Sequence, residues 1–242
     1  MTMERQRPKH IGIVGCSAEG AALCYRTICE EGERFLGERY AHPEVTMHTF
    51  SFAEYVKMIE AGDWDGIAEL MLASAEKVAR AGAEFAICPD NTVHIAFDKV
   101  AARSPIPWLH IAEEVAREAK SRGYKRVGVM GTRFLVESSV YPEKLEAFGI
   151  EAVIPEEADR ELVNRIIFDE LVCGKFLPES RARLCEVVER LKARGCEAVV
   201  LGCTELPLIV TPDVSPLPVL DSTRILARAA LREATGKSPD EG

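Results

Sequence analysis

Short runs rich in β-branched residues alternate along this chain with longer amphipathic stretches, and this alternation limits the possible folds more than any other feature. Strands separated by helix-length segments indicate βαβ units, a parallel sheet and right-handed crossovers. In open sheets of this kind, ligands bind beyond the carboxyl ends of the strands. The expected strands cover residues 10–15, 45–50, 85–88, 126–130, 151–154 and 197–201, and the expected helices cover residues 21–35, 65–81, 111–121, 138–148, 156–171, 179–193 and 223–235.

The sequence also repeats internally. Residues 82–92 (GAEFAICPDNT) align without a gap on residues 195–205 (GCEAVVLGCTE), which places Asp90 on Cys203. A second alignment places IGIVG at residues 11–15 on VGVMG at residues 127–131. We therefore predict two related α/β lobes, each with a glycine turn after one strand and a polar tripeptide after another.

The repeat suggests a chemical role for Asp90 and Cys203. If the lobes face each other about a pseudo-twofold axis, these two side chains approach one crevice from opposite sides. Inversion of a carbon centre requires one acid/base group on each face, and a duplicated lobe supplies both. The alternative interpretation is that both tripeptides are ordinary strand-to-helix turns, which are common in α/β proteins.

Charge and cysteine content restrict the possible partners and compartment. Thirty basic and 39 acidic residues give a net charge of −9, which argues against nucleic acid or an anionic membrane as the main partner. No apolar stretch reaches the length of about 18 residues that suggests a membrane-spanning helix, and no export signal is recognisable. The eight cysteines are too sparse for a disulfide scaffold, so we expect reduced thiols in a cytoplasmic protein. Metal-ligand spacing and a dinucleotide-binding glycine pattern are both lacking.

Several motifs, in order along the chain, resemble those of the aspartate/glutamate racemase family. The resemblance implies an enzyme that needs no pyridoxal phosphate or other cofactor, and a homodimer. It also implies two flavodoxin-like lobes, one of residues 1–105 and 215–242 and one of residues 106–214, with the active site in the crevice between them. The motifs are GDWD at 62–65, DNTVH at 90–94, GTRF at 131–134, IIFDEL at 166–171, GK at 174–175, GCTELP at 202–207 and DST at 221–223.

The resemblance assigns roles to individual residues. Cys203 matches the second catalytic cysteine of the family. Lys175 matches a basic residue that contacts the side-chain carboxylate of acidic substrates in some members. Unpaired backbone amides at helix starts also suit a carboxylate for physical reasons. The residues implied to hold the substrate's α-carboxylate are Asn91, Thr92, Thr132 and Thr204.

Two departures from the family pattern bear on activity. Asp90 stands where the family has its first catalytic cysteine, and Cys88, two residues upstream, is expected to be structural. Ser17-Ala-Glu19 replaces a glycine-rich, threonine-containing loop. We expect Ser17 to bind substrate, whereas Glu19 would repel an acidic substrate only if it pointed inward.

An aspartate in place of a cysteine makes the two acid/base groups unequal. Their ordinary pKa values, about 3.9 and 8.5, differ by roughly 6 kcal/mol in proton affinity. Burial can raise the pKa of a carboxyl by about 3–5 units, and a helix N-terminus after Cys203 would lower the pKa of the thiol. We therefore expect proton abstraction by Cys203 to be faster than abstraction by Asp90.

Together these features predict a cofactor-independent racemase or epimerase acting on a small amino acid, with Asp90 and Cys203 as its acid/base pair. Two alternatives remain open. One is a related isomerase or decarboxylase with a single essential thiol, in which Cys203 protonates a planar intermediate from one side only. The other is a catalytically silent protein that binds a small carboxylic acid.

Overall fold

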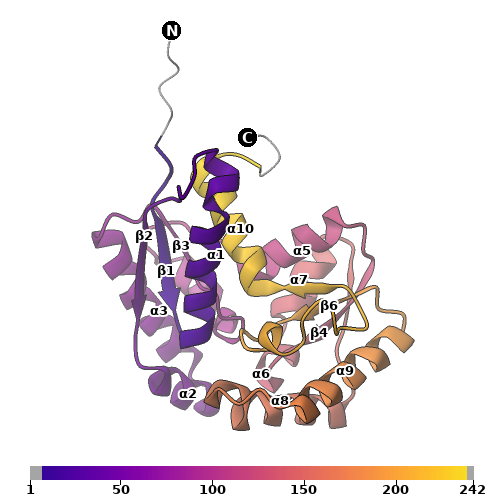
Figure 1. Cartoon of the computed structure of the whole chain (residues 1–242). Coiled ribbons are helices and arrows are strands. Elements are labelled where there is room, and N and C mark those ends of the chain that lie inside the picture. Colours follow the sequence, from indigo (N-terminus) through magenta and orange to yellow (C-terminus); the bar gives the residue numbers. More distant parts are fainter. Residues whose placement is uncertain (1–6, 239–242) are drawn as a thin grey trace.

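Two parallel β-sheets form the framework of the computed structural model, which describes residues 7–238 (Figure 1). The predicted α/β fold with two parallel sheets is therefore confirmed. The first sheet has the order β2-β1-β3 and the second the order β5-β4-β6-β7. The strands are β1 (Ile11–Gly15), β2 (Val45–Thr49), β3 (Phe85–Ile87), β4 (Arg126–Met130), β5 (Glu151–Val153), β6 (Ala198–Leu201) and β7 (Val219–Asp221).

The two sheets are built alike around their central strands. β1 lies between β2 and β3 just as β4 lies between β5 and β6, which is the relation that the internal repeat predicts. Trp108 makes an isolated parallel bridge to Ala86 of β3, in the place where β7 pairs with β6 in the second sheet. β1 is buried along its whole length, and β4 is buried beyond its first residue. Their continuous apolar sequences are typical of parallel strands covered on both faces.

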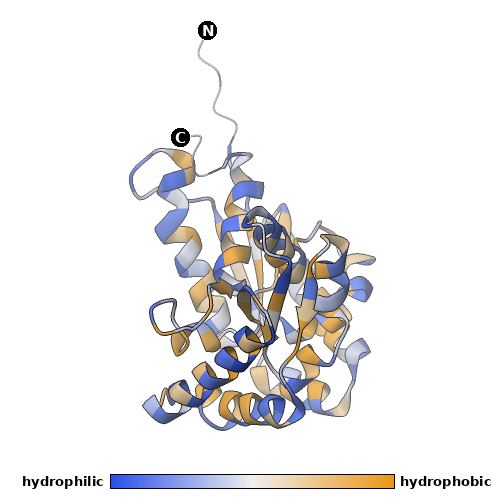
Figure 2. Ribbon diagram, turned by 90° about the vertical axis from the view of Figure 1, so that its right-hand side faces the viewer, coloured by the Kyte–Doolittle hydropathy of each residue, from blue (hydrophilic) through white to orange (hydrophobic). Residues whose placement is uncertain are grey.

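Amphipathic helices cover these sheets, and most of them carry both hydrophilic and hydrophobic residues (Figure 2). Within residues 7–238 no helix combines the length and the apolar character needed to cross a membrane. In the first lobe the helical segments are α1 (Ala18–Leu36), α2 (Phe52–Ala61), α3 (Trp64–Arg80), η1 (Thr92–Ala96) and α4 (Phe97–Ala101). In the second lobe they are α6 (Arg133–Val136), α7 (Val140–Ala147), α8 (Glu157–Asp169), η2 (Leu171–Cys173), α9 (Pro178–Ala193) and η3 (Leu206–Leu208).

Two further helices, α5 (Ile111–Ser121) and α10 (Ser222–Thr235), join the lobes. α10 follows β7 of the second sheet but packs along α1 (Figure 1), and its Leu231 lies in the same apolar cluster as Ile11 of β1. α5 follows the bridge to the first sheet, yet its Val115 lies in the core of the second lobe. The C-terminal segment, as far as the structure describes it, contributes to both lobes: β7 belongs to the second sheet, whereas α10 packs on the first lobe.

The sequence pattern does not predict every element. α2 and β7 are not expected from it, because α2 buries only Tyr55 and Ile59 and β7 has only three residues. The helix expected over residues 138–148 is shorter, and a separate turn of helix, α6, precedes it. The helix expected after Cys203 is replaced by a turn and the three residues of η3.

Candidate active site

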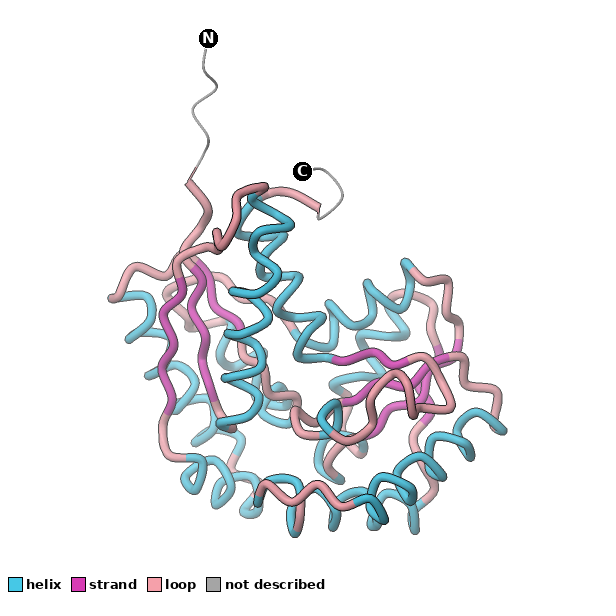
Figure 3. The backbone as a smooth tube through the Cα atoms, in the orientation of Figure 1, coloured by secondary structure: helices cyan, strands magenta, loops and turns pink. Residues whose placement is uncertain are grey.

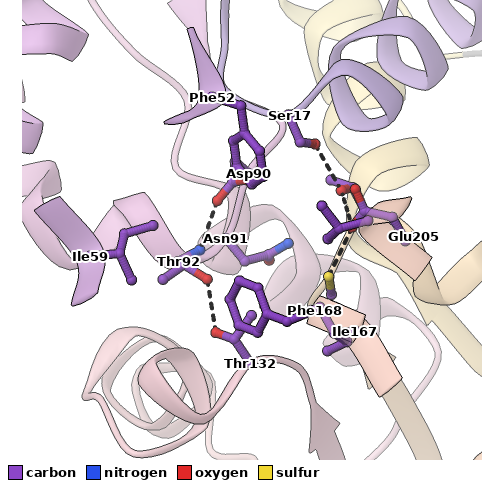
Figure 4. Close-up of a pocket in the computed structure, with 14 residues that line it drawn as sticks. Ser17, Phe52, Ile59, Asp90, Asn91, Thr92, Thr132, Ile167, Phe168 and Glu205 are labelled. Carbon is purple, nitrogen blue, oxygen red and sulfur yellow. Dashed lines mark hydrogen bonds between the residues drawn. The ribbon is translucent and has the colours of Figure 1, made fainter. Parts of the chain in front are cut away.

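The loops that follow β3 and β6 approach each other between the sheets (Figure 3), and a pocket opens where they meet. The pocket is narrow, since the region that the centre of a water-sized sphere can reach is about 30 Å³. A ligand in this pocket would therefore contact lining side chains on several sides. The lining residues are Ser17, Phe52, Ile59, Asp90, Asn91, Thr92, Thr132, Ile167, Phe168, Val172, Gly202, Cys203, Thr204 and Glu205 (Figure 4).

Asp90 lies three residues beyond the end of β3. Its Oδ1 accepts hydrogen bonds from the backbone N–H groups of Thr92 (3.1 Å) and Val93 (3.5 Å), which hold the turn that begins η1. Burial and the nearby Glu205 raise the pKa of Asp90 to about 6, although the two N–H groups and the Cys16 thiol act in the opposite direction. At pH 7 this carboxyl is therefore mostly ionised and able to accept a proton.

Cys203 lies two residues beyond the end of β6. Its Sγ donates a hydrogen bond to Oε2 of Glu205 (3.0 Å), and the Thr204 hydroxyl donates to the same oxygen (2.7 Å). Burial, followed by the charge of Glu205, raises the pKa of the Cys203 thiol well above its ordinary value. The expectation that a helix N-terminus lowers this pKa is wrong, because η3 is a single short turn and the carboxyl of Glu205 is the nearest charged group.

Asp90 and Glu205 occupy opposite sides of the pocket (Figure 4). The thiol of Cys203 is bonded to Glu205. Both Asp90 and Cys203 remain partly accessible, whereas Thr204 and Glu205 are buried. The two groups that the internal repeat places in equivalent positions therefore both reach the pocket.

Two hydroxyl pairs connect the lobes on either side of the pocket. Thr92 Oγ1 lies 3.0 Å from Thr132 Oγ1, and Ser17 Oγ lies 3.1 Å from Thr204 Oγ1. Thr132 caps α6 by accepting from the N–H of Leu135, and Ser17 caps α1 in the same way. The loop of Asp90 therefore contacts, through Thr92, the residue that caps α6 of the second lobe. The loop of Cys203 contacts, through Thr204, the residue that caps α1 of the first lobe.

Buried polar groups outside the reactive pair form hydrogen bonds with the loop that follows β3 and carries Asp90. Asn91 accepts a hydrogen bond from Tyr141 (2.6 Å) and donates one to Ser222 (3.0 Å), so its amide links the first lobe to α7 and α10. His94 Nδ1 donates to the carbonyl of Asp90 (2.7 Å) and its Nε2 accepts from the N–H of Ile111. Burial lowers the pKa of His94 to about 4, which keeps the ring neutral. His94 is thus a structural link, while Asn91 both lines the pocket and supports it.

Lys175, Glu19 and Cys88 lie outside the pocket. Lys175 is exposed beyond η2, so the expected contact with a substrate carboxylate finds no support in this geometry. Glu19 is exposed in the first turn of α1 and does not point inward. Cys88 is fully buried in the core of the first lobe. Asn91, Thr92, Thr132, Thr204 and Ser17 all line the pocket, and their role in binding substrate stays a prediction.

Glu205 and an apolar wall around the pocket were not identified from the sequence. Glu205 aligns with Thr92 in the internal repeat, and only its burial marks it as part of the site. Phe52 and Ile59 come from α2, which the pattern does not predict. Among residues 7–238, no group of three or more His, Cys, Asp or Glu side chains could hold a metal ion.

Comparison with known proteins shows which family the chain is similar to. A family model described as Asp/Glu/Hydantoin racemase matches residues 11–230. A broad specificity amino-acid racemase of Bacillus subtilis is 25% identical over 169 residues, covering 70% of this chain and 73% of that protein.

Two solved structures are more similar still. A candidate Asp/Glu racemase from Yersinia pestis has 35% identity and a TM-score of 0.84, with 93% of this chain and 99% of that one covered. An aspartate racemase homologue from Pyrococcus horikoshii has 32% identity and a TM-score of 0.79, with 94% and 99% covered. The resemblance seen in the motifs is thereby confirmed, and the chain belongs to the Asp/Glu/hydantoin racemase family.

Proposed function

We propose that the protein is a cofactor-independent amino-acid racemase or epimerase in which Asp90 and Cys203 act on opposite faces of the substrate's α-carbon. The observation that carries the proposal is that these two groups, at equivalent positions of the repeat, both line one narrow pocket and are partly accessible. Family membership supports the same reaction class. The hydroxyls of Ser17, Thr92 and Thr132 line the pocket and are suited to hold the α-carboxylate.

The pKa shifts indicate which group carries a proton before the reaction. Near neutral pH Asp90 is ionised and Cys203 is a thiol, so the pair holds one proton. The Asp90 carboxylate accepts the α-proton of one enantiomer, and the electron pair of that C–H bond stays on the planar carbanion. Cys203 then donates its proton to the opposite face and is left as a thiolate.

The reverse direction starts from protonated Asp90 and a Cys203 thiolate. Glu205 lies 3.0 Å from Sγ and raises the pKa of Cys203, which makes the thiolate a strong base once it forms. Asp90, with a pKa of about 6, is the weaker base but the one already ionised. The faster abstraction by Cys203 remains a prediction, which single-turnover hydrogen exchange from each enantiomer tests.

Exchange and inversion of amino acids in deuterium oxide test the proposed function. Each enantiomer of a panel of amino acids is followed by proton NMR for loss of the α-hydrogen and by chiral chromatography for inversion. Asp90→Asn and Cys203→Ser should each lower inversion by at least about 100-fold. Asn retains an Oδ1 that can accept the N–H groups of Thr92 and Val93, so the turn should survive. Cys185→Ser, outside the pocket, is the matched control.

Two outcomes would contradict the proposal. Exchange without inversion, lost only in Cys203→Ser, would indicate a one-thiol enzyme. Binding without exchange by any amino acid would indicate a catalytically silent protein. Asp90→Cys, which restores two thiols, is expected to raise the rate of inversion.

A further inference from the structure

The wall of the pocket between the reactive groups is apolar. Phe52 and Ile59 project from α2 of the first lobe, and they are seven residues, or two helical turns, apart. From the second lobe come Ile167 and Phe168 of α8 and Val172 of η2. In Figure 4 Phe52 lies toward the top of the pocket and Phe168 toward the bottom. A substrate held between Asp90 and Cys203 would therefore place its side chain against hydrocarbon.

Positive charge is lacking in the same pocket. No Lys, Arg or His is among the residues that line it in the described part of the chain, whereas Asp90 and Glu205 are. The basic residues of the two helices that form the wall are Lys57 on α2 and Arg160 and Arg165 on α8, and none of them lines the pocket. Lys57 and Arg165 are exposed, and Arg160 is paired with Glu137. Lys175, the position at which the family resemblance implies a basic contact, is exposed as well.

The charges that line the pocket favour one class of substrate. The carboxyl groups of Asp90 and Glu205 complement the ammonium group of an amino acid, but they repel a second carboxylate on its side chain. The hydrocarbon that lines this narrow pocket would strip such a carboxylate of much of its hydration, and a buried charge without a partner is strongly disfavoured. An apolar side chain of similar size is not repelled and has no charge to desolvate. Its removal from water also favours binding.

We propose that the site selects amino acids with apolar side chains and excludes aspartate and glutamate, with Phe52, Ile59, Ile167, Phe168 and Val172 as the specificity-determining wall. This inference rests on the proposed function, because it takes the ligand to be an amino acid seated between Asp90 and Cys203. It commits the protein to substrates of the leucine or methionine class.

Binding of unreactive carboxylic acids tests the wall independently of catalysis. 4-Methylpentanoate carries one carboxylate and a leucine-like tail, whereas glutarate carries a carboxylate at each end. Calorimetric titration of the full-length protein should give a Kd for glutarate at least about 100-fold weaker than for 4-methylpentanoate. Equal or tighter binding of glutarate would overturn the inference, even if the protein proved to be a racemase.

Turnover by wall variants provides the second arm. Phe168→Ala should lower kcat/KM for leucine by about tenfold or more while leaving alanine, whose side chain does not reach the wall, nearly unchanged. Phe176→Ala removes an exposed phenylalanine outside the pocket and is the matched control. Glutamate turned over as well as leucine by the unaltered enzyme would overturn the inference. Preferential binding of 4-methylpentanoate without exchange of any amino acid would instead contradict the proposed function and leave the apolar selectivity supported.

Discussion

Asp90 and Cys203 occupy corresponding positions in the two halves of the repeat, but different neighbours surround their reactive atoms. The carboxylate of Asp90 accepts two backbone N–H groups, whereas the thiol of Cys203 donates to a buried carboxyl. Hydrogen bonds of the first kind favour the charged form and the second kind favours the protonated form. Near neutral pH these contacts therefore leave Asp90 ionised and Cys203 protonated, so the two groups hold one proton between them.

The pH dependence of catalysis follows from this pair. As the pH falls through about 6, Asp90 gains a proton and the singly protonated pair is lost, so kcat/KM should fall. It should fall equally for both enantiomers, because the equilibrium constant of racemisation is one. Glu205→Gln removes a charge that raises the pKa of Asp90, so this acid limb should move to lower pH.

The same substitution should lower kcat/KM at neutral pH, since a lower pKa makes Asp90, the group already ionised, a weaker base. Initial rates measured between pH 4.5 and 8 for both enantiomers provide the check. Glu19→Gln, which removes an exposed carboxyl outside the pocket, serves as the control. An acid limb unmoved in Glu205→Gln would show that Glu205 does not act on Asp90.

At the scale of elements, the first turn of α1 sets how closely the two polar loops approach. Gly20 is in this turn, and a Cβ built on it would lie 2.4 Å from Cγ2 of Thr204 and 2.9 Å from the carbonyl oxygen of Pro89. Both contacts belong to the loops that carry the reactive groups. The lack of a side chain at this position allows α1 to begin directly against them.

Gly20→Ala should therefore separate the loops and disturb the site. The free energy of unfolding should fall by about 1–3 kcal/mol, and kcat should fall with it. A loss of stability would distinguish this site from an ordinary helical position, where replacing glycine by alanine raises the free energy of unfolding by up to about 1 kcal/mol. Denaturant unfolding and initial rates measure the two effects, with Glu19→Ala in the same turn as control. A more stable variant would contradict the close approach.

Across the whole molecule, α5 and α10 make the lobes depend on each other. α10 packs on α1 while following a strand of the second sheet, and Arg228 of α10 forms two hydrogen bonds, each of 2.8 Å, with Glu31 of α1. Loss of either lobe would expose apolar surface that the other covers. The two lobes should consequently unfold together.

Leu231→Ala tests this coupling. Leu231 is fully buried on α10 beside β1, so the variant should lose about 2–5 kcal/mol of stability and still unfold in one transition. Circular dichroism and tryptophan fluorescence, followed through the same denaturant series, should give one midpoint. Leu177→Ala, at an exposed leucine, should change stability by no more than about 0.5 kcal/mol. Two separate midpoints would contradict the coupling.

Local sequence patterns are sufficient to predict those strands and helices of this protein whose burial follows from the spacing of neighbouring residues. The strand at 126–130 and the helix at 111–121 agree with their predicted ranges, because hydrophobic spacing determines which face of each is buried. The internal repeat places Asp90 and Cys203 in equivalent positions, and the structure brings both to one pocket. The motifs identify the family.

Tertiary structure alone decides the environment of those two groups. The pKa of Asp90 depends on Glu205, which is distant in sequence, and the apolar wall combines Phe52 with Phe168 from different lobes. Burial and charge proximity are properties of three-dimensional packing, so no spacing in the chain predicts them. The amino-acid sequence thus determined the fold, the family and the proposed acid/base pair, whereas the tertiary structure decided which member of that pair is ionised and which side chains line the pocket around it.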